Sequence, residues 1–216
     1  MINIDLLIRE LPNLLNACKS TIYIAFFSTL LGLIGGTCIA LAERSSYILI
    51  RFIARAYIFI VRGTPMIVQI VFYYYVFNLP VEPITVAVFA IGFNSAAYIS
   101  QVIKTGIKAV DKGQIEAAMV MGFTPWQITR FFILPQAFRA IFPALGNEFT
   151  TLIKDSSLAY IIGVNELFKT SRNLMNVTYD VITIYVGITL LYFIMTSIVT
   201  LFLTLIEKKW NMHAEY

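Results

Sequence analysis

The sequence has few charged residues, two cysteines and a single histidine. Charged residues make up 13% of the 216 residues and hydrophobic residues 59%, whereas soluble domains carry about 25% charged and about 45–50% apolar residues. Cys18 and Cys38 lie in one apolar run, about 30 Å apart if that run is helical, which excludes a local disulfide. The composition is that of an all-α polytopic membrane protein.

Motifs for nucleotide, dinucleotide or metal binding are also missing. There is no GxxxxGK[ST] loop, GxGxxG, HExxH or CxxC, and the only histidine, His213, falls in the C-terminal tail, away from any nucleophile. We therefore expect no metal site, no cofactor and no enzymatic activity on this chain. The net charge of +4 fits basic cytoplasmic loops of a membrane protein better than a nucleic-acid partner.

Long apolar runs predict about five membrane-spanning helices in one transmembrane domain, residues 1–216. The expected spans are 21–42, 56–77, 84–103, 136–164 and 181–205, each long enough for a hydrocarbon core of about 30 Å. Residues 1–17 are expected to lie as an amphipathic helix at the interface, and 165–180 to form a polar loop. Gly63 and Pro65 predict a kink or break within the second span.

The distribution of basic residues predicts the orientation. One side of the five-span topology collects Arg44, Arg51, Arg55, Lys104, Lys108, Lys112, Arg130, Arg139, Lys208 and Lys209. The other side collects only Arg9, Lys19, Lys169 and Arg172. Because Lys and Arg accumulate in cytoplasmic loops, we expect the N-terminus outside and the C-terminus in the cytoplasm.

Residues 111–135 predict two short capped helices between the third and fourth spans, on the cytoplasmic side. Asp111 is a candidate N-cap, with Gln114 three residues later, and Gly122 a candidate C-terminal stop. Thr124, Pro125 and Gln127 form a second N-terminal signature. Pro135 is expected to interrupt the second helix.

This segment resembles the EAA motif of the permease subunits of bacterial ABC importers. Glu116, Ala117 and Ala118 are followed after three residues by Gly122, and after nine more variable residues Phe132 stands where the family has Ile, ahead of Leu134 and Pro135. Flanking sequences are similar to those of the polar amino-acid importers: RGTP from Arg62, NSAAYI from Asn94, KGQ from Lys112, and GNEF to IGV over 146–164. Gln101 and Lys104 depart from the Glu and Arg that many of these permeases carry.

The resemblance implies the assembly as well as the activity. It makes residues 111–135, here called the coupling segment, the element that docks on an ATPase subunit through Glu116, Ala117, Ala118, Gly122, Leu134 and Pro135. Two ATPase subunits, which bind ATP and Mg, a second copy or homologue of this permease, and an extracytoplasmic amino-acid-binding protein would complete an importer in the bacterial cytoplasmic (inner) membrane.

Polar and ionisable residues inside the spans are candidates for the substrate pathway, because lipid exposure of such groups is costly. The set is Arg62, Thr64, Gln69, Asn94, Tyr98, Glu148, Lys154 and Asp155. Glu148 or Asp155 would accept the ammonium of an amino acid, and Arg62, Lys154 or Thr64 would bind its carboxylate. Two carboxylates on one helix face would also suit a basic amino acid. The alternatives are a structural network of Glu148, Lys154 and Asp155 that closes a gate, and interhelical hydrogen bonding by the polar residues.

Other functions stay open at this point. The chain would also suit an ABC permease for another small nutrient, a passive channel or a membrane-embedded enzyme. An enzyme would need an acid–base or metal constellation that the sequence does not contain, and a channel would work without nucleotide. ATP-dependent uptake and co-purification with an ATPase distinguish these functions.

Overall fold

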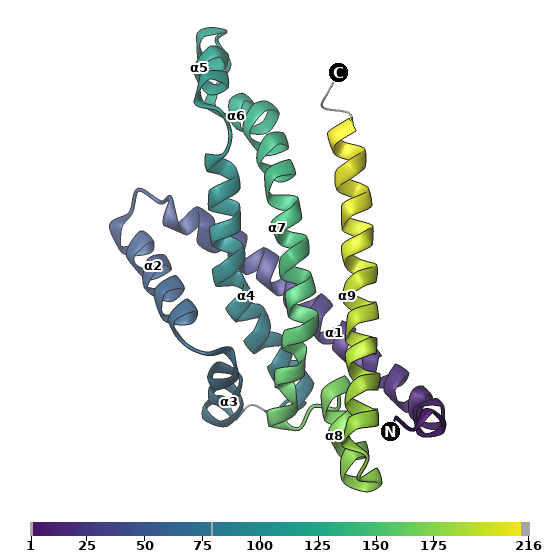
Figure 1. Ribbon diagram of the computed structural model, residues 1–216. Helices are drawn as coiled ribbons and strands as arrows, with labels where there is room; N and C mark the ends of the chain where they lie inside the picture. Colours follow the sequence, from purple (N-terminus) through teal and green to yellow (C-terminus); the bar gives the residue numbers. More distant parts are fainter. Residues whose placement is uncertain (1, 79, 213–216) are drawn as a thin grey trace.

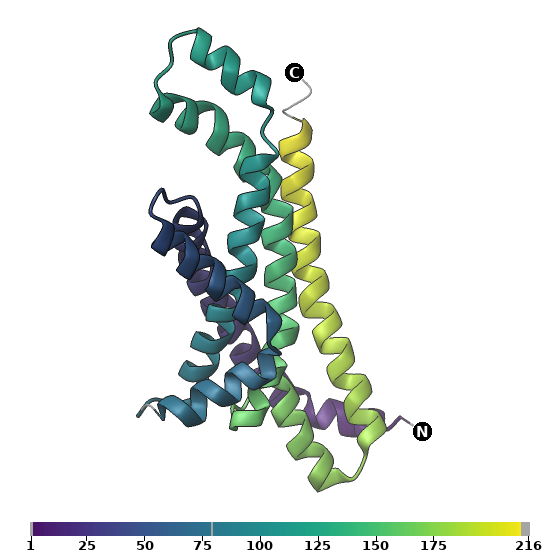
Figure 2. The ribbon, with the colours of Figure 1, turned by 90° about the vertical axis from the view of Figure 1, so that its left-hand side faces the viewer.

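Four long helices dominate the computed structural model, which describes residues 2–78 and 80–212 (Figure 1). They are α1 (Ile4–Glu43), α4 (Pro83–Lys108), α7 (Leu134–Asp155) and α9 (Val181–Met212). Helices α4, α7 and α9 run alongside one another, and α1 crosses them obliquely (Figures 1 and 2). The two ends of the chain lie at opposite ends of this bundle.

Helix α1 shows that the expected interfacial helix and the first span are one element. It runs unbroken for 40 residues, with Pro12 inside it and Asn3 as its N-cap. Leu14, Ala17 and Cys18 of its N-terminal half are buried against Leu167 and Ile188. The predicted lead-in over 1–17 is therefore continuous with the first span, and its position at the membrane interface stays a prediction.

The predicted break in the second span is confirmed and is sharper than a kink. Helix α2 (Ile48–Gly63) ends at Gly63, and α3 (Met66–Phe77) begins after Pro65. The two helices are bent by 109°. Thr64 and Pro65 have extended backbones, as expected where proline cannot continue a helix. Residues 56–77 are therefore not one straight span.

Among the described residues, three helices are long and apolar enough to cross a membrane: α1, α4 and α9. The bent pair of α2 and α3 is a fourth if it counts as one span. Helix α7 fails the same test of hydropathy and charge, although it has 22 residues, and it carries Arg139, Glu148, Lys154 and Asp155. The count of five spans stays a prediction.

The chain between α7 and α9 is more helical than expected. The α-helical part of the predicted span 136–164 stops at Asp155, and a 3-10 helix, η2 (Ser156–Ile162), follows it. Gly163, with φ of 86°, ends η2. Helix α8 (Leu167–Thr178) then occupies the predicted polar loop, because buried Glu166 caps its first turn and Leu167, Ser171 and Met175 bury one face.

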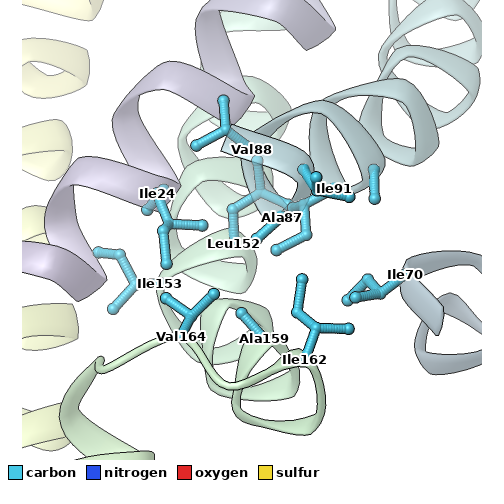
Figure 3. Close-up of a cluster of buried hydrophobic side chains, with 13 residues drawn as sticks. Ile24, Ile70, Ala87, Val88, Ile91, Leu152, Ile153, Ala159, Ile162 and Val164 are labelled. Atoms are coloured by element: carbon cyan, nitrogen blue, oxygen red, sulfur yellow. The ribbon is translucent and has the colours of Figure 1, made fainter. Parts of the chain in front are cut away.

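The main core lies where α1, α4, α7, α3 and η2 meet (Figure 3). Ile24, Ile91, Leu152, Ile162 and Ile70 each contribute one buried side chain from these elements. Close contact between α1 and α4 depends on glycine: a Cβ added at Gly36 would lie 2.8 Å from Cγ2 of Ile99. A glycine at this position thus lets the two helices approach closely.

Candidate functional site

The coupling segment projects from the ends of α4 and α7, at the same end of the molecule as the C-terminus (Figures 1 and 2). It comprises α5 (Lys112–Val120), α6 (Pro125–Ile128) and η1 (Thr129–Ile133). The Asp111 side chain accepts a hydrogen bond from the amide of Gln114 at 3.2 Å. Thr124 and Gln127 form a reciprocal capping box with Pro125 at the first turn. Both predicted N-terminal caps are confirmed.

Gly122 terminates α5 in the left-handed conformation, with φ of 83°. Its amide donates to the carbonyl of Met119 at 3.0 Å, and the amide of Phe123 donates to the carbonyl of Ala118 at 3.1 Å. These two bonds are the Schellman arrangement, which favours glycine because a Cβ is strained there. The predicted stop at Gly122 is confirmed.

Pro135 does not interrupt the second helix of the coupling segment, so that prediction was wrong. Residues Thr129–Ile133 form a π-helical turn, η1, that runs directly into α7. Proline has no amide hydrogen to donate to the preceding turn, and a wider turn accommodates that missing bond without ending the helix. Leu134 and Pro135 are therefore the first residues of α7.

The residues of the EAA motif differ in their exposure. Glu116 and Ala117 are exposed on α5, and Leu134 and Pro135 are exposed at the start of α7. Ala118 is fully buried inside the segment, so it packs within this chain and does not present itself to a partner. Val120, one turn from Glu116 on α5, is 89% exposed, and Trp126 on α6 is 67% exposed, so the coupling segment also presents apolar surface.

Side-chain contacts hold the coupling segment to the bundle. Gln136 Nε2 donates to Gln114 Oε1 at 2.6 Å and links α7 to α5. Phe132, the residue that replaces the family's Ile, packs edge-on against Phe123 with ring centroids 5.3 Å apart. The aromatic ring at Phe132 thus closes the turn between α5 and α6.

A cavity of about 350 Å³ opens between α2, α4 and α7. Arg62, Tyr98 and Glu148 line it from these three helices, with Gln101 beside them. The Arg62 guanidinium lies over the Tyr98 ring, 5.1 Å from its centroid. Ser95 Oγ donates to Glu148 Oε1 at 2.8 Å. One cation and one carboxylate therefore line a common space between α2, α4 and α7.

Three of the predicted pathway residues, exposed Thr64 and buried Gln69 and Asn94, form a separate network at the break between α2 and α3. Gln69 Nε2 donates to Thr64 Oγ1 at 2.6 Å and to the carbonyl of Val61 at 2.8 Å. Asn94 Nδ2 donates to Gln69 Oε1 at 3.0 Å. Thr64 and Gln69 thus satisfy backbone carbonyls at the end of α2, Asn94 holds the Gln69 side chain, and none of the three lines the cavity with Arg62.

Lys154 and Asp155 lie at the far end of α7 from the coupling segment. Asp155 is seven residues from Glu148, which is about 10 Å along a helix, and neither it nor Lys154 lines the cavity. In the described part of the chain, no ion pair joins Lys154, Asp155 and Glu148. The alternative of a Glu148–Lys154–Asp155 network that closes a gate between subunits stays a prediction.

A second polar cluster beside the cavity was missed by the sequence analysis. Buried Glu43 accepts from Lys104 Nζ at 2.6 Å and from Gln101 Nε2 at 2.9 Å, with Arg55 Nε at 3.8 Å. Gln101 and Lys104 are the two positions that depart from the family pattern, and both contact Glu43. The unusual residues at positions 101 and 104 therefore indicated a local difference, but the sequence did not identify Glu43 as the residue that they contact.

Metal-binding geometry is not found in residues 2–78 and 80–212, where no group of three His, Cys, Asp or Glu side chains is placed to hold an ion. His213 lies outside the described residues. The site therefore consists of the coupling segment and the Arg62–Glu148 cavity, joined by α4 and α7.

Comparison with known proteins identifies relatives over nearly the whole chain. Residues 28–212 match the family model described as binding-protein-dependent transport system inner membrane component. The "Probable amino-acid ABC transporter permease protein YckA" of Bacillus subtilis is 36% identical over 211 residues, 96% of this chain and 93% of the relative. The arginine transport system permease protein ArtQ of Bacillus subtilis is 33% identical over 208 residues, 94% of each chain.

A solved structure has the same fold. The crystal structure of an amino acid ABC transporter with histidines superimposes with a TM-score of 0.91 at 34% identity, covering 97% of this chain and 99% of that one.

Proposed function

This chain belongs to the binding-protein-dependent transport system inner membrane component family, and we propose that it is the permease subunit of an ATP-driven importer of polar amino acids. Its relatives are named as amino-acid permeases, one of them for arginine. The observation that carries the proposal is the capped coupling segment, which presents exposed Glu116 and apolar surface at one end of α4 and α7. A surface of this kind fits docking on an ATPase.

The proposed mechanism is rigid-body transmission from the ATPase to the cavity. Helix α5 is held at both ends by caps and tied to α7 through Gln114 and Gln136. Helices α4 and α7 continue from the coupling segment to the cavity of Arg62 and Glu148. Closure of two ATPase subunits would move these helices as levers and alternate the access of the cavity between the two sides of the membrane.

The orientation supports this arrangement. The coupling segment and the C-terminus lie at one end of the bundle and the N-terminus at the other (Figure 1). The end with the coupling segment carries Lys108, Lys112, Arg130 and Arg139, and basic loops face the cytoplasm. We infer a cytoplasmic coupling segment and an extracellular N-terminus in the bacterial cytoplasmic membrane.

The cavity fits a zwitterion. Arg62 would bind the substrate carboxylate and Glu148 its ammonium, because hydrogen bonds between charged groups are stronger than those between neutral groups. Asp155 does not line this cavity, so the second carboxylate that would favour a basic amino acid is not part of it. The general class, a polar amino acid, is therefore better supported than a basic one.

One chain supplies half of the translocation path for the amino acid. We therefore propose a two-fold dimer with a second copy of this chain or with a homologous permease. Two ATPase subunits would bind ATP and Mg, and an extracytoplasmic binding protein would deliver the amino acid. This chain itself would hold no nucleotide.

The test is uptake of labelled amino acids into vesicles that contain the reconstituted complex and enclosed ATP. We expect uptake that requires ATP hydrolysis, and a Glu116→Lys variant that recovers at least about ten-fold less ATPase on purification. Glu82→Lys makes the same charge change at the opposite end of α4, where Glu82 is exposed and makes no capping bond, and should leave ATPase recovery unchanged. Uptake without nucleotide would indicate a channel and overturn the proposal.

A further inference from the structure

An apolar groove of about 550 Å³ lies between α1, α2 and α4. It shares no lining residue with the cavity of Arg62 and Glu148. Gly35 and Ala96 form part of its floor, where α1 and α4 are so close that a Cβ on Gly35 would lie 3.1 Å from that of Ala96. Its lining carries two polar side-chain groups, the Cys38 thiol and the Tyr57 hydroxyl, and the hydroxyl donates to the carbonyl of Phe93. The groove therefore suits an apolar occupant.

The length of the groove argues for a lipid chain. Along α1 it extends from Leu31 to Ala42, which is about 16 Å of helix. A hydrocarbon core is about 30 Å thick, so the groove covers about one leaflet. A transmembrane helix from another subunit would need the full thickness, whereas an acyl chain needs half of it.

Basic residues gather at one end of the groove. Arg44 directly follows α1, and Arg51 and Arg55 lie in the first turns of α2, near the lining residues Ala42 and Ile50. Leu31 and Phe89 line the opposite, apolar end. Arg55 is paired with Glu43 at 3.8 Å, but within residues 2–78 and 80–212 neither Arg44 nor Arg51 has an ion-pair partner. Two arginines are therefore available for an anion at this end.

We propose that the groove binds an acyl chain of an anionic phospholipid, whose phosphate lies against Arg44 and Arg51. Basic sites between membrane helices on the cytoplasmic side bind anionic lipid head groups, and arginine is well suited to phosphate. Placing the lipid in the cytoplasmic leaflet rests on the proposed orientation of the permease, but the binding itself does not depend on the cargo.

Photocrosslinking of the complete complex tests this proposal. Vesicles of phosphatidylcholine and phosphatidylglycerol would contain a trace of either lipid with a photoreactive group on one acyl chain, and labelled peptides would be mapped by mass spectrometry. We expect phosphatidylglycerol to label groove residues at least about five-fold more than the exposed α9 residues Leu190 and Phe193. Phosphatidylcholine should label both places equally.

Matched variants separate the head group from the chain. Arg44→Gln with Arg51→Gln should reduce groove labelling by phosphatidylglycerol to the level of phosphatidylcholine. Lys208→Gln with Lys209→Gln removes two exposed cations near the end of α9 and should have no effect. Cys38→Trp, which places a large ring within the groove, should strongly reduce its labelling. Leu41→Trp, at an exposed position on the same helix that does not line the groove, should preserve it.

Equal labelling of groove and α9 by phosphatidylglycerol would show ordinary surrounding lipid only and would overturn the proposal. A bifunctional reagent on Cys38 that captures a second permease copy would also overturn it, because the groove would then be a subunit interface. Labelling requires no transport, so either failure leaves the permease function untouched.

Discussion

Lys104 Nζ lies 2.6 Å from Glu43 Oε1 and joins the C-terminal part of α4 to the end of α1. The Glu43 side chain is only 6% exposed and also accepts a hydrogen bond from Gln101. A carboxylate so buried is stable in its charged form only when cations and donors surround it. The cluster therefore fixes α1, α2 and α4 next to the cavity.

Lys104→Met should destabilise the protein by about 1–3 kcal/mol, the typical penalty for a buried group that loses its partner. Arg55→Met should lower the stability of the protein by a smaller amount. Arg55 lies 3.8 Å from Glu43, and its side chain is 63% exposed, compared with 33% for Lys104. Thermal unfolding of the purified complex measures both. Adding Glu43→Gln to Lys104→Met should recover part of the loss; equal losses from the two single variants would contradict this account.

Glu148→Gln should weaken transport affinity, since Glu148 supplies the cavity with its carboxylate. A charged hydrogen bond contributes about 1.5–3 kcal/mol, so we expect a rise in KM of about ten-fold or more. Asp155→Asn is the matched control on the same helix face, outside the cavity, and should leave KM unchanged. Initial uptake rates over a range of amino-acid concentrations measure both; an effect of Asp155→Asn alone would move the substrate site along α7.

Local features of the fold were predictable from the sequence. The caps at Asp111 and Thr124, the stop at Gly122 and the break at Pro65 each depend on residues within one or two turns. Helix α8 was missed because its polar composition was interpreted as a loop. Leu167, Ser171 and Met175 recur at every fourth position and are the buried residues of α8; this helical spacing was overlooked.

Contacts between distant residues were not predictable. Glu43 and Gln101 are 58 positions apart, and their pairing depends on which helix faces come together. The same limit explains the interpretation of Gln69 and Asn94 as cavity residues: the sequence placed them in the membrane, but only the packing of α3 on α4 shows that they bind each other. Arg62 and Glu148, in contrast, line one cavity, and their role in a substrate pathway stays a prediction.

Gly122→Ala should strain the coupling segment, because alanine at positive φ costs about 1–2 kcal/mol. We expect weaker association with the ATPase, measured by co-purification and by the ATPase rate of the complex. Gly163 is the matched control: it also has positive φ, 86°, and no heavy atom near its missing Cβ, but it lies beyond the far end of α7. Gly163→Ala should lower thermal stability by a similar amount and leave ATPase association intact. If both variants lost ATPase association equally, reduced stability of the permease alone would explain the loss, and the conformation of Gly122 would have no specific role in docking.

Glu166 predicts a pH dependence of stability. Burial raises the pKa of this carboxyl from 4.5 to about 7, although the amides of Phe168 and Lys169 and the Tyr192 hydroxyl donate to it. The folded state then binds more protons than the unfolded state between these two values. Stability therefore falls as pH rises from about 4.5 to about 7 and is constant above that range. The upper limit of this contribution is about 3 kcal/mol.

The expected result is a higher unfolding temperature at pH 5.5 than at pH 7.5, measured on the purified complex. Glu166→Gln keeps an oxygen that can accept from the first turn of α8 but does not titrate, so the difference between the two pH values should shrink. Glu82→Gln is the control for general effects of charge, because Glu82 is exposed and makes no capping bond, and it should retain the wild-type difference. A Glu166→Gln variant with the full pH dependence would show that the titrating group lies elsewhere, and would leave Glu166 as a cap for α8 whose protonation has no effect on folding.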